Sequence, residues 1–148
     1  MKDDKRLDGI IGTLFGQQPL AVLSTQGPEF PHASLVAFAA SDDLRTLLFA
    51  TFRQTRKYDN MAREPRVALT VDSRTATEAD LLHTIVVTAF GAAHEVPHEE
   101  RELWQGVYLA RHPSLQAFVE SPDCALMAVR VQWYDVISDF QNVETLAF

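Results

Sequence analysis

Residues 47–69 read LLFATFRQTRKYDNMAREPRVAL, and this stretch decides the fold because three elements follow one another in it. The apolar and aromatic run at Thr46–Thr51 predicts a strand. A short helix is expected to begin after Thr55 and to end by Glu64, because a residue that precedes proline is pushed out of the α region. Alternating apolar residues over Arg66–Asp72 predict the next strand. The stretch therefore predicts two strands joined by a loop and a short helix.

The flanking sequence repeats the strand pattern. An amphipathic helix is expected within residues 1–17, and helices after Pro97 and Pro113 form a helical excursion over residues 97–121. The pattern of Leu82–Val96 predicts a long strand in which Gly91 marks a bulge or a sharp bend. Residues 1–148 are thus expected to form a single domain of the mostly β (α+β) class, with six or seven antiparallel strands in a barrel or sandwich. The remaining expected strands are residues 19–25, 32–39, 125–133 and 134–140.

Composition and charge restrict the class of protein. The chain has 148 residues, 47% of them hydrophobic, which is typical of one globular domain. Thirteen basic and twenty acidic residues give a net charge of −7, which argues against nucleic-acid binding. The N-terminus lacks the apolar segment of a secretory signal, and no apolar run is long enough to span a membrane. A single cysteine, Cys124, cannot form an internal disulfide, so we expect a cytoplasmic protein with Cys124 in its core.

The basic residues gather in one place, since residues 51–66 hold five cations against two acids. Thr55 is a suitable helix N-cap, which would place the free N–H groups of the first helical turn beside Arg56 and Lys57. Such a helix start is suited to bind a phosphate group. Cations at this end destabilise a bare helix, and a bound anion would remove that conflict. The alternative is an ordinary solvated helix end.

These features together resemble the FMN-binding split β-barrel family typified by pyridoxamine 5′-phosphate oxidase. The motifs that carry the resemblance are a strand end, a helix start, the end of that helix and an upstream strand, at Ala50-Thr51, Thr55-Arg56-Lys57, Glu64-Pro65 and PHASLVAF of Pro31–Phe38. Their order agrees with the family from about Pro19 to Phe140. The resemblance implies that Thr55, Arg56 and Lys57 hold the FMN phosphate. It also implies that the ribityl chain and the isoalloxazine ring lie beside Ala33, Ser34, Leu35, Val36, Ala50 and Thr51.

The same resemblance implies a homodimer, because two subunits of this family pack their barrels together with the flavin at the interface. Trp133 is then a candidate to stack on the flavin of the second subunit, although burial alone would also explain this aromatic residue. The well-known oxidases carry an arginine where Ser34 stands, and they end in an arginine-rich segment that binds the substrate phosphate. We therefore expect an FMN-dependent oxidoreductase that acts on an unidentified small molecule, rather than a pyridoxamine-phosphate oxidase.

Two alternative functions keep the fold. A haem-binding split barrel would need an axial ligand that faces the cavity, and His32, His83 and His94 are the histidines on expected strands. The other alternative is a non-catalytic barrel that binds flavin or another partner. The sequence shows no convincing nucleophile or base triad, so the catalytic residues are unknown.

The residues His94-Glu95-Val96-Pro97-His98 match the zinc motif H-E-x-x-H, which binds metal only on a helix. Because Pro97 interrupts helical hydrogen bonding, we expect a strand end with surface histidines and no metal site. In the helix that follows, Trp104 and Tyr108 have the spacing of a core-facing stripe. His112, which precedes a proline, is expected at the surface or in a helix cap.

Overall fold

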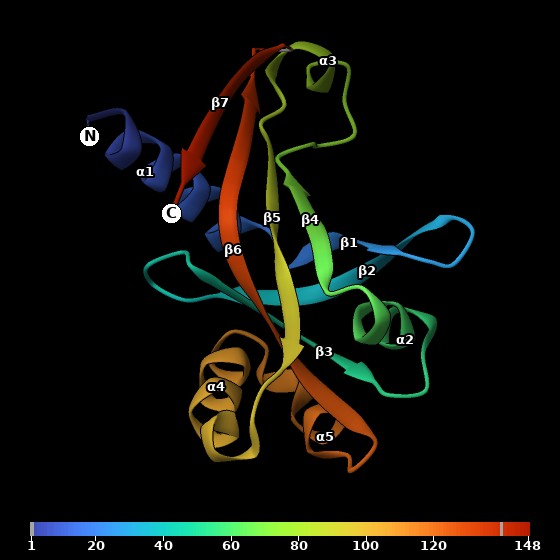
Figure 1. Cartoon of the computed structure of the whole chain (residues 1–148). Coiled ribbons are helices and arrows are strands. Elements are labelled where there is room, and N and C mark those ends of the chain that lie inside the picture. The colour runs from blue at the N-terminus through green and yellow to red at the C-terminus, as the bar shows by residue number, and fades with distance from the viewer. Residues whose placement is uncertain (1, 140) are drawn as a thin grey trace.

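The computed structural model describes residues 2–139 and 141–148, and its strands form one antiparallel sheet (Figure 1). The strand order is β3-β2-β1-β4-β5-β6-β7, and β3 also pairs with β6. This additional pairing closes β1 to β6 into a barrel, and β7 extends the sheet beside the second half of β6. The strands are β1 (Leu20–Gln26), β2 (Pro31–Ala40), β3 (Thr46–Phe52), β4 (Arg66–Asp72), β5 (Val86–Glu95), β6 (Cys124–Ser138) and β7 (Asn142–Ala147).

Short helices surround the barrel (Figure 1). The first helix packs Leu7, Ile11 and Leu14 into the barrel interior, so it covers one part of the core. None of the helices among residues 2–139 and 141–148 is long and apolar enough to cross a membrane. The helices are α1 (Lys2–Gln17), α2 (Arg56–Arg63), α3 (Asp80–His83), α4 (His98–Arg111), the 3₁₀ turn η1 (Pro113–Leu115) and α5 (Gln116–Glu120).

Two apolar clusters stabilise the molecule. The first fills the barrel, where Phe38, Phe49 and Tyr134 are among the largest fully buried side chains. The second lies between the outer face of the barrel and the helices α4 and α5, and it includes Tyr108 and Cys124. Their burial confirms the sequence-based expectation for these two residues. The first half of β6 is consequently buried on both faces.

The fold class is confirmed, and Gly91 does mark a bulge, but two predicted strand boundaries are wrong and one strand was missed. Residues 134–140 are not a separate strand, because β6 continues without a break to Ser138, and Phe140 lies outside the described residues. The strand β7 was not predicted at all. Leu82 and His83 belong to the short helix α3, since the fifth strand begins only at Val86.

Candidate functional site

The bulge between β5 and β6 turns one aromatic side chain outward. Phe90 pairs with Trp133 and Gly91 with Val131, so Gln132 is the extra residue. Strand alternation would otherwise send Trp133 into the barrel, but the extra residue places Gln132 and Trp133 on the outer face together, while Tyr134 points into the core. Glycine is needed at position 91, because a Cβ there would lie less than 3.0 Å from the Arg130 backbone carbonyl.

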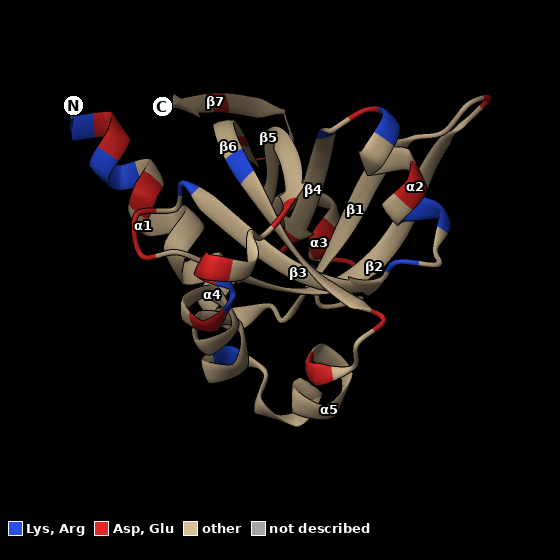
Figure 2. Ribbon diagram, turned by 60° about the horizontal axis from the view of Figure 1, so that its bottom comes forward, with Lys and Arg blue, Asp and Glu red and all other residues tan. Residues whose placement is uncertain are grey.

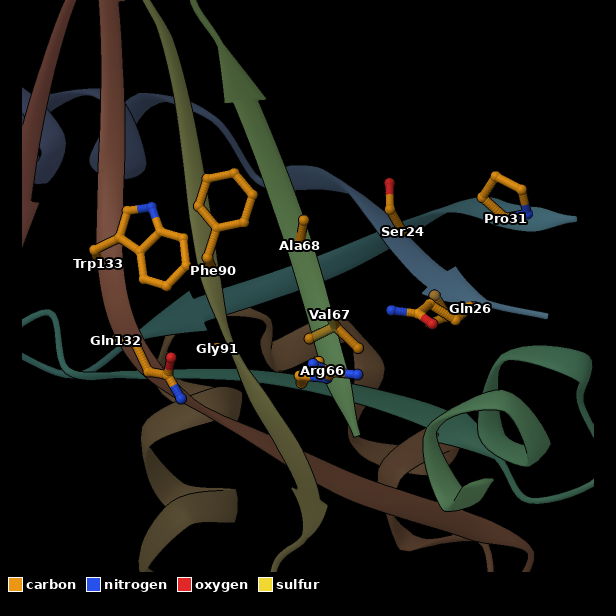
Figure 3. Close-up of a pocket in the computed structure, with 11 residues that line it drawn as sticks. Ser24, Gln26, Pro31, Arg66, Val67, Ala68, Phe90, Gly91, Gln132 and Trp133 are labelled. Atoms are coloured by element: carbon orange, nitrogen blue, oxygen red, sulfur yellow. The ribbon is translucent and has the colours of Figure 1, made fainter. Parts of the chain in front are cut away.

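A pocket of about 290 Å³ opens on this outer face, across strands β1, β4, β5 and β6 (Figure 3). Trp133 stacks on Phe90 with ring centroids 4.9 Å apart and planes inclined by 20°. Figure 3 shows these two rings at one side of the pocket, with Gln26 and Pro31 at the other side. A flat aromatic wall with a few polar groups opposite is suited to one face of a planar ring system.

The helix α2 starts with the expected cap. Thr55 Oγ1 accepts a hydrogen bond from the Tyr58 backbone N–H at 3.3 Å, and it donates to the Phe52 carbonyl at 2.9 Å. Its oxygen also lies 3.1 Å from Thr51 Oγ1, which is 1% exposed at the end of β3. Two of the predicted site residues, Thr51 and Thr55, are therefore in direct contact. These bonds fix the loop that presents the first turn of α2.

Figure 2 shows basic residues on and beside α2, and their side-chain contacts divide them into two groups. Arg53 pairs with Glu95 at 2.6 Å, Arg66 pairs with Glu64 at 2.6 Å, and Arg63 donates to Asn60 Oδ1 at 2.8 Å. The side chains of Arg56 and Lys57, by contrast, form no hydrogen bond or ion pair with any residue that the structure describes. The two unpaired cations thus sit at the positive end of a helix whose first turn has free N–H groups.

The barrel is split beside the predicted ring-binding strand. Strand β2 pairs with β3 only over residues 38–40, so residues 31–37 pair with β1 on one side and have no strand on the other among the described residues. The bond from the Phe38 N–H to the Pro19 carbonyl shows that even-numbered residues of β2 face β1. The backbone N–H and C=O groups of Ala33 and Leu35 therefore point into the split.

The four predicted residues of β2 do not share a face. Ala33 and Leu35 are exposed on the outer side, with Leu35 66% exposed, whereas Val36 is in the barrel core. Ser34 is half-buried, and its Oγ is enclosed without any hydrogen-bond partner. His32 Nδ1 is enclosed in the same way. A ligand on this strand could meet the side chains of only two of the four, together with backbone groups of the free edge.

A second pocket, of about 370 Å³, lies next to the β1–β2 hairpin and is lined by Arg56, His32 and residues 27–31. Pro31 lines this pocket and also the Trp133 pocket. The structure therefore brings Arg56 and Trp133 to two pockets that share one bordering residue. Ala50 faces the second apolar cluster at 8% exposure, next to the split.

The sequence did not predict the role of Glu95. Its carboxylate accepts hydrogen bonds from Arg53 Nη2 at 2.6 Å and from the Tyr58 hydroxyl at 2.9 Å. The bond from Arg53 is the main cause that lowers the pKa of Glu95, and the Tyr58 hydroxyl lowers it further. The same Arg53–Glu95 bond raises the pKa of Arg53. This network ties the loop before α2 to the end of β5. The H-E-x-x-H match contained Glu95 but suggested a different role.

The zinc motif itself spans two elements. His94 and Glu95 end β5, whereas His98 begins α4, so the two histidines do not share a helix face. Both histidines are exposed, as predicted. His112 is the C-cap of α4, which confirms one of the two predicted alternatives. It is not at the surface, because it is buried at 9% exposure with its Nε2 2.7 Å from the Phe38 carbonyl.

Comparison with known proteins gives the family. The family model described as Pyridoxamine 5′-phosphate oxidase matches residues 10–138. The chain belongs to the pyridoxamine 5′-phosphate oxidase-like family. This assignment agrees with the split barrel and with the motif at the start of α2. No curated protein matches the chain.

Solved structures share the fold at low identity. A haem-binding protein from Mycobacterium smegmatis superposes with a TM-score of 0.80 and 18% identity, over 91% of this chain. General Stress Protein 26 from Bacillus anthracis has a TM-score of 0.70 and 22% identity, over 96% of this chain and 98% of its own. An FAD-binding protein from Mesorhizobium loti has a TM-score of 0.67 and 16% identity, over 83% of this chain and 88% of its own. This chain spans 55% of the length of the M. smegmatis protein.

Proposed function

We propose that this family member binds FMN as a homodimer and acts as an oxidoreductase on a small molecule. The observation that carries the proposal is the pair of unpaired cations, Arg56 and Lys57, at the capped start of α2. Unpaired charge at the positive end of a helix is unfavourable until an anion occupies the site. A phosphate would accept hydrogen bonds from the first-turn N–H groups and from both side chains.

The free edge of β2 supports a flavin ring beside this phosphate site. The backbone groups of Ala33 and Leu35 offer two donor and acceptor pairs, about 7 Å apart along the strand. The isoalloxazine edge carries both N–H and C=O groups, which can pair with such a backbone edge.

Bound FMN would supply hydride or electron transfer. The residues of this chain would then bind and orient it: Thr55, Arg56 and Lys57 at the phosphate, and the β2 edge at the ring. Trp133 would shield a ring face, as its outward position on the bulge allows. Leu35 is 66% and Trp133 37% exposed, and a second subunit packed over them would exclude water from the ring.

Haem is the second candidate, because one of the fold neighbours is a haem-binding protein. Haem needs an axial ligand such as histidine in its pocket. The Trp133 pocket contains no histidine, and His32 lines the pocket beside Arg56 instead. The residues present therefore fit FMN better than haem.

The test is a paired charge removal. Arg56→Ala with Lys57→Ala should weaken FMN binding at least 100-fold, measured by quenching of flavin fluorescence on titration, with unchanged circular dichroism. The control removes the same net charge from exposed positions elsewhere, Arg74→Ala with Arg130→Ala, and should change the affinity less than threefold. Equal affinities of the two double variants would overturn the phosphate-site assignment.

A further inference from the structure

The split between β2 and β3 begins at a defined rung of the sheet. The last paired residues are Phe38 with Phe49, and the next step along both strands would place Ala37 opposite Ala50. Alternation of the ladder makes this a hydrogen-bonded pair, because Phe38 directs its own backbone groups toward β1. In a continuous sheet the Ala50 N–H would donate directly to the Ala37 carbonyl.

A tyrosine hydroxyl occupies that rung instead. The Tyr108 hydroxyl donates to the Ala37 carbonyl at 3.0 Å. The Ala50 backbone N–H lies close enough to the same oxygen to oppose part of the rise in its pKa. The side chain is 1% exposed, and burial raises the pKa of Tyr108 to about 12, so the phenol keeps the proton that it donates. The hydroxyl group thus satisfies the Ala37 carbonyl, which the missing ladder bond would have joined to the Ala50 N–H.

The helix α4, which carries Tyr108, is fastened at its end to β2 and to the segment before β1. Arg111 Nη2 donates to the Gln18 carbonyl at 2.6 Å, just before β1, and His112 Nε2 lies 2.7 Å from the Phe38 carbonyl. Because a carbonyl only accepts, His112 carries its proton on Nε2. Both bonds come from residues just after Tyr108, and they hold the end of α4 against β2 and against the residues that lead into β1.

We propose that Tyr108 is a positioning residue that opens the barrel at Ala37 and Ala50 and sets the spacing between the two halves of the cofactor site. The proposal rests on the FMN function proposed above. Beyond Tyr108, β2 leads to the backbone edge at Ala33 and Leu35, whereas β3 leads to Thr51 and the cations at the start of α2. The ring edge and the phosphate corner are thus on separate strands that meet at Tyr108.

This arrangement predicts an effect that depends on ligand size. FMN would contact both strands at once, so its affinity depends on how far apart they are held. Lumiflavin, which is the ring without its phosphate chain, would contact only the β2 side. Inorganic phosphate would contact only the start of α2. A change in spacing should therefore weaken FMN and spare the two fragments.

The experiment compares Tyr108→Phe with Tyr134→Phe. Both remove one buried hydroxyl that donates to a backbone carbonyl, Leu44 in the case of Tyr134, but Tyr134 lies within the closed part of the barrel. FMN, lumiflavin and inorganic phosphate are titrated against each protein by nuclear magnetic resonance. For Tyr108→Phe we expect at least a tenfold loss of FMN affinity and less than a twofold change for either fragment. For Tyr134→Phe we expect all three affinities to stay within twofold.

Amide hydrogen exchange tests, without any ligand, whether the Tyr108 hydroxyl takes the place of the ladder bond between Ala37 and Ala50. The Ala50 amide should be protected in the unmodified chain and should exchange at least tenfold faster in Tyr108→Phe, but not in Tyr134→Phe. Unchanged FMN affinity in Tyr108→Phe, or an equal loss for FMN and the fragments, would overturn the positioning role. Failure of the unmodified chain to bind FMN would instead overturn the proposed function and the cofactor part of this proposal. Unchanged exchange of the Ala50 amide in Tyr108→Phe would show that the Tyr108 hydroxyl does not replace the ladder bond between Ala37 and Ala50.

Discussion

We predict that Gly91→Ala destabilises the fold, because the β5–β6 bulge leaves no space for an added methyl group at this position. In Gly91→Ala the new Cβ would lie closer than 3.0 Å to the Arg130 carbonyl, and also near its carbonyl carbon. That carbonyl is backbone in the β5–β6 ladder, where Ala92 pairs with Arg130, so it cannot rotate away as a side chain could. Relief requires that the two strands move apart or that the bulge rearranges.

The expected cost follows from this geometry. Forcing an extra methyl group into a packed site costs roughly 1–3 kcal/mol, and replacing glycine with alanine returns about 0.4–1 kcal/mol through the unfolded state. We expect a net destabilisation of about 1–2 kcal/mol. For a chain of this size each kcal/mol lowers Tm by roughly 2–4 °C, so the loss should be about 2–8 °C.

The assay is urea unfolding at one fixed protein concentration, followed by circular dichroism and by tryptophan fluorescence. Gly106→Ala is the matched control, because Gly106 lies inside α4 with nothing within 4 Å of its added Cβ. That variant should be more stable by roughly 0.5–1 kcal/mol. If the bulge rearranges, the fluorescence of Trp133 should change as well. Equal stability of the two variants would refute the close approach at Gly91.

Three further predictions concern single side chains. Thr55→Ala removes the N-cap of α2 and should cost about 1 kcal/mol in urea unfolding, whereas Thr55→Ser should cost only a few tenths. Glu95 has its pKa lowered in the folded state chiefly by the bond from Arg53, so its stabilising effect is present above its ordinary value of 4.5 and is lost as the pH falls through the lowered value. Glu95→Gln should therefore be less stable at neutral pH and should lose less stability between about pH 5 and pH 3; parallel pH profiles for the two proteins would contradict this. Tyr134→Phe leaves the buried Leu44 carbonyl without its 2.6 Å partner and should cost about 1–3 kcal/mol by thermal unfolding, and a loss below half a kcal/mol would show that water replaces the hydroxyl.

Local sequence signals predicted the elements around α2 well. Thr55 caps the helix and Pro65 limits it, and both effects act over a few residues, so they survive in the folded chain. The glycine at position 91 signalled a bulge for the same reason. The family motif at residues 55–57 coincides with the start of α2, where the side chains of Arg56 and Lys57 have no ion pair among the described residues.

Features that depend on distant residues could not be predicted. Nothing in the sequence near position 134 shows that β6 leaves its pairing with β3 there, because β3 lies far away in the chain, and the neighbouring hairpin partner β7 was missed. Tyr108 has the spacing of an ordinary core residue, and only the register of β2 and β3 shows that its hydroxyl replaces a ladder bond. Glu95 likewise depends on Arg53, which lies 42 residues earlier.

The central claim, that the split at β2 and the start of α2 hold FMN, is tested most directly on the purified chain. Its visible absorption spectrum is recorded, the protein is denatured by heat, and the released small molecule is identified by mass. We expect flavin bands and released FMN, or stoichiometric uptake of added FMN by protein purified without it. A Soret band, or a colourless protein that takes up no FMN, would contradict the account.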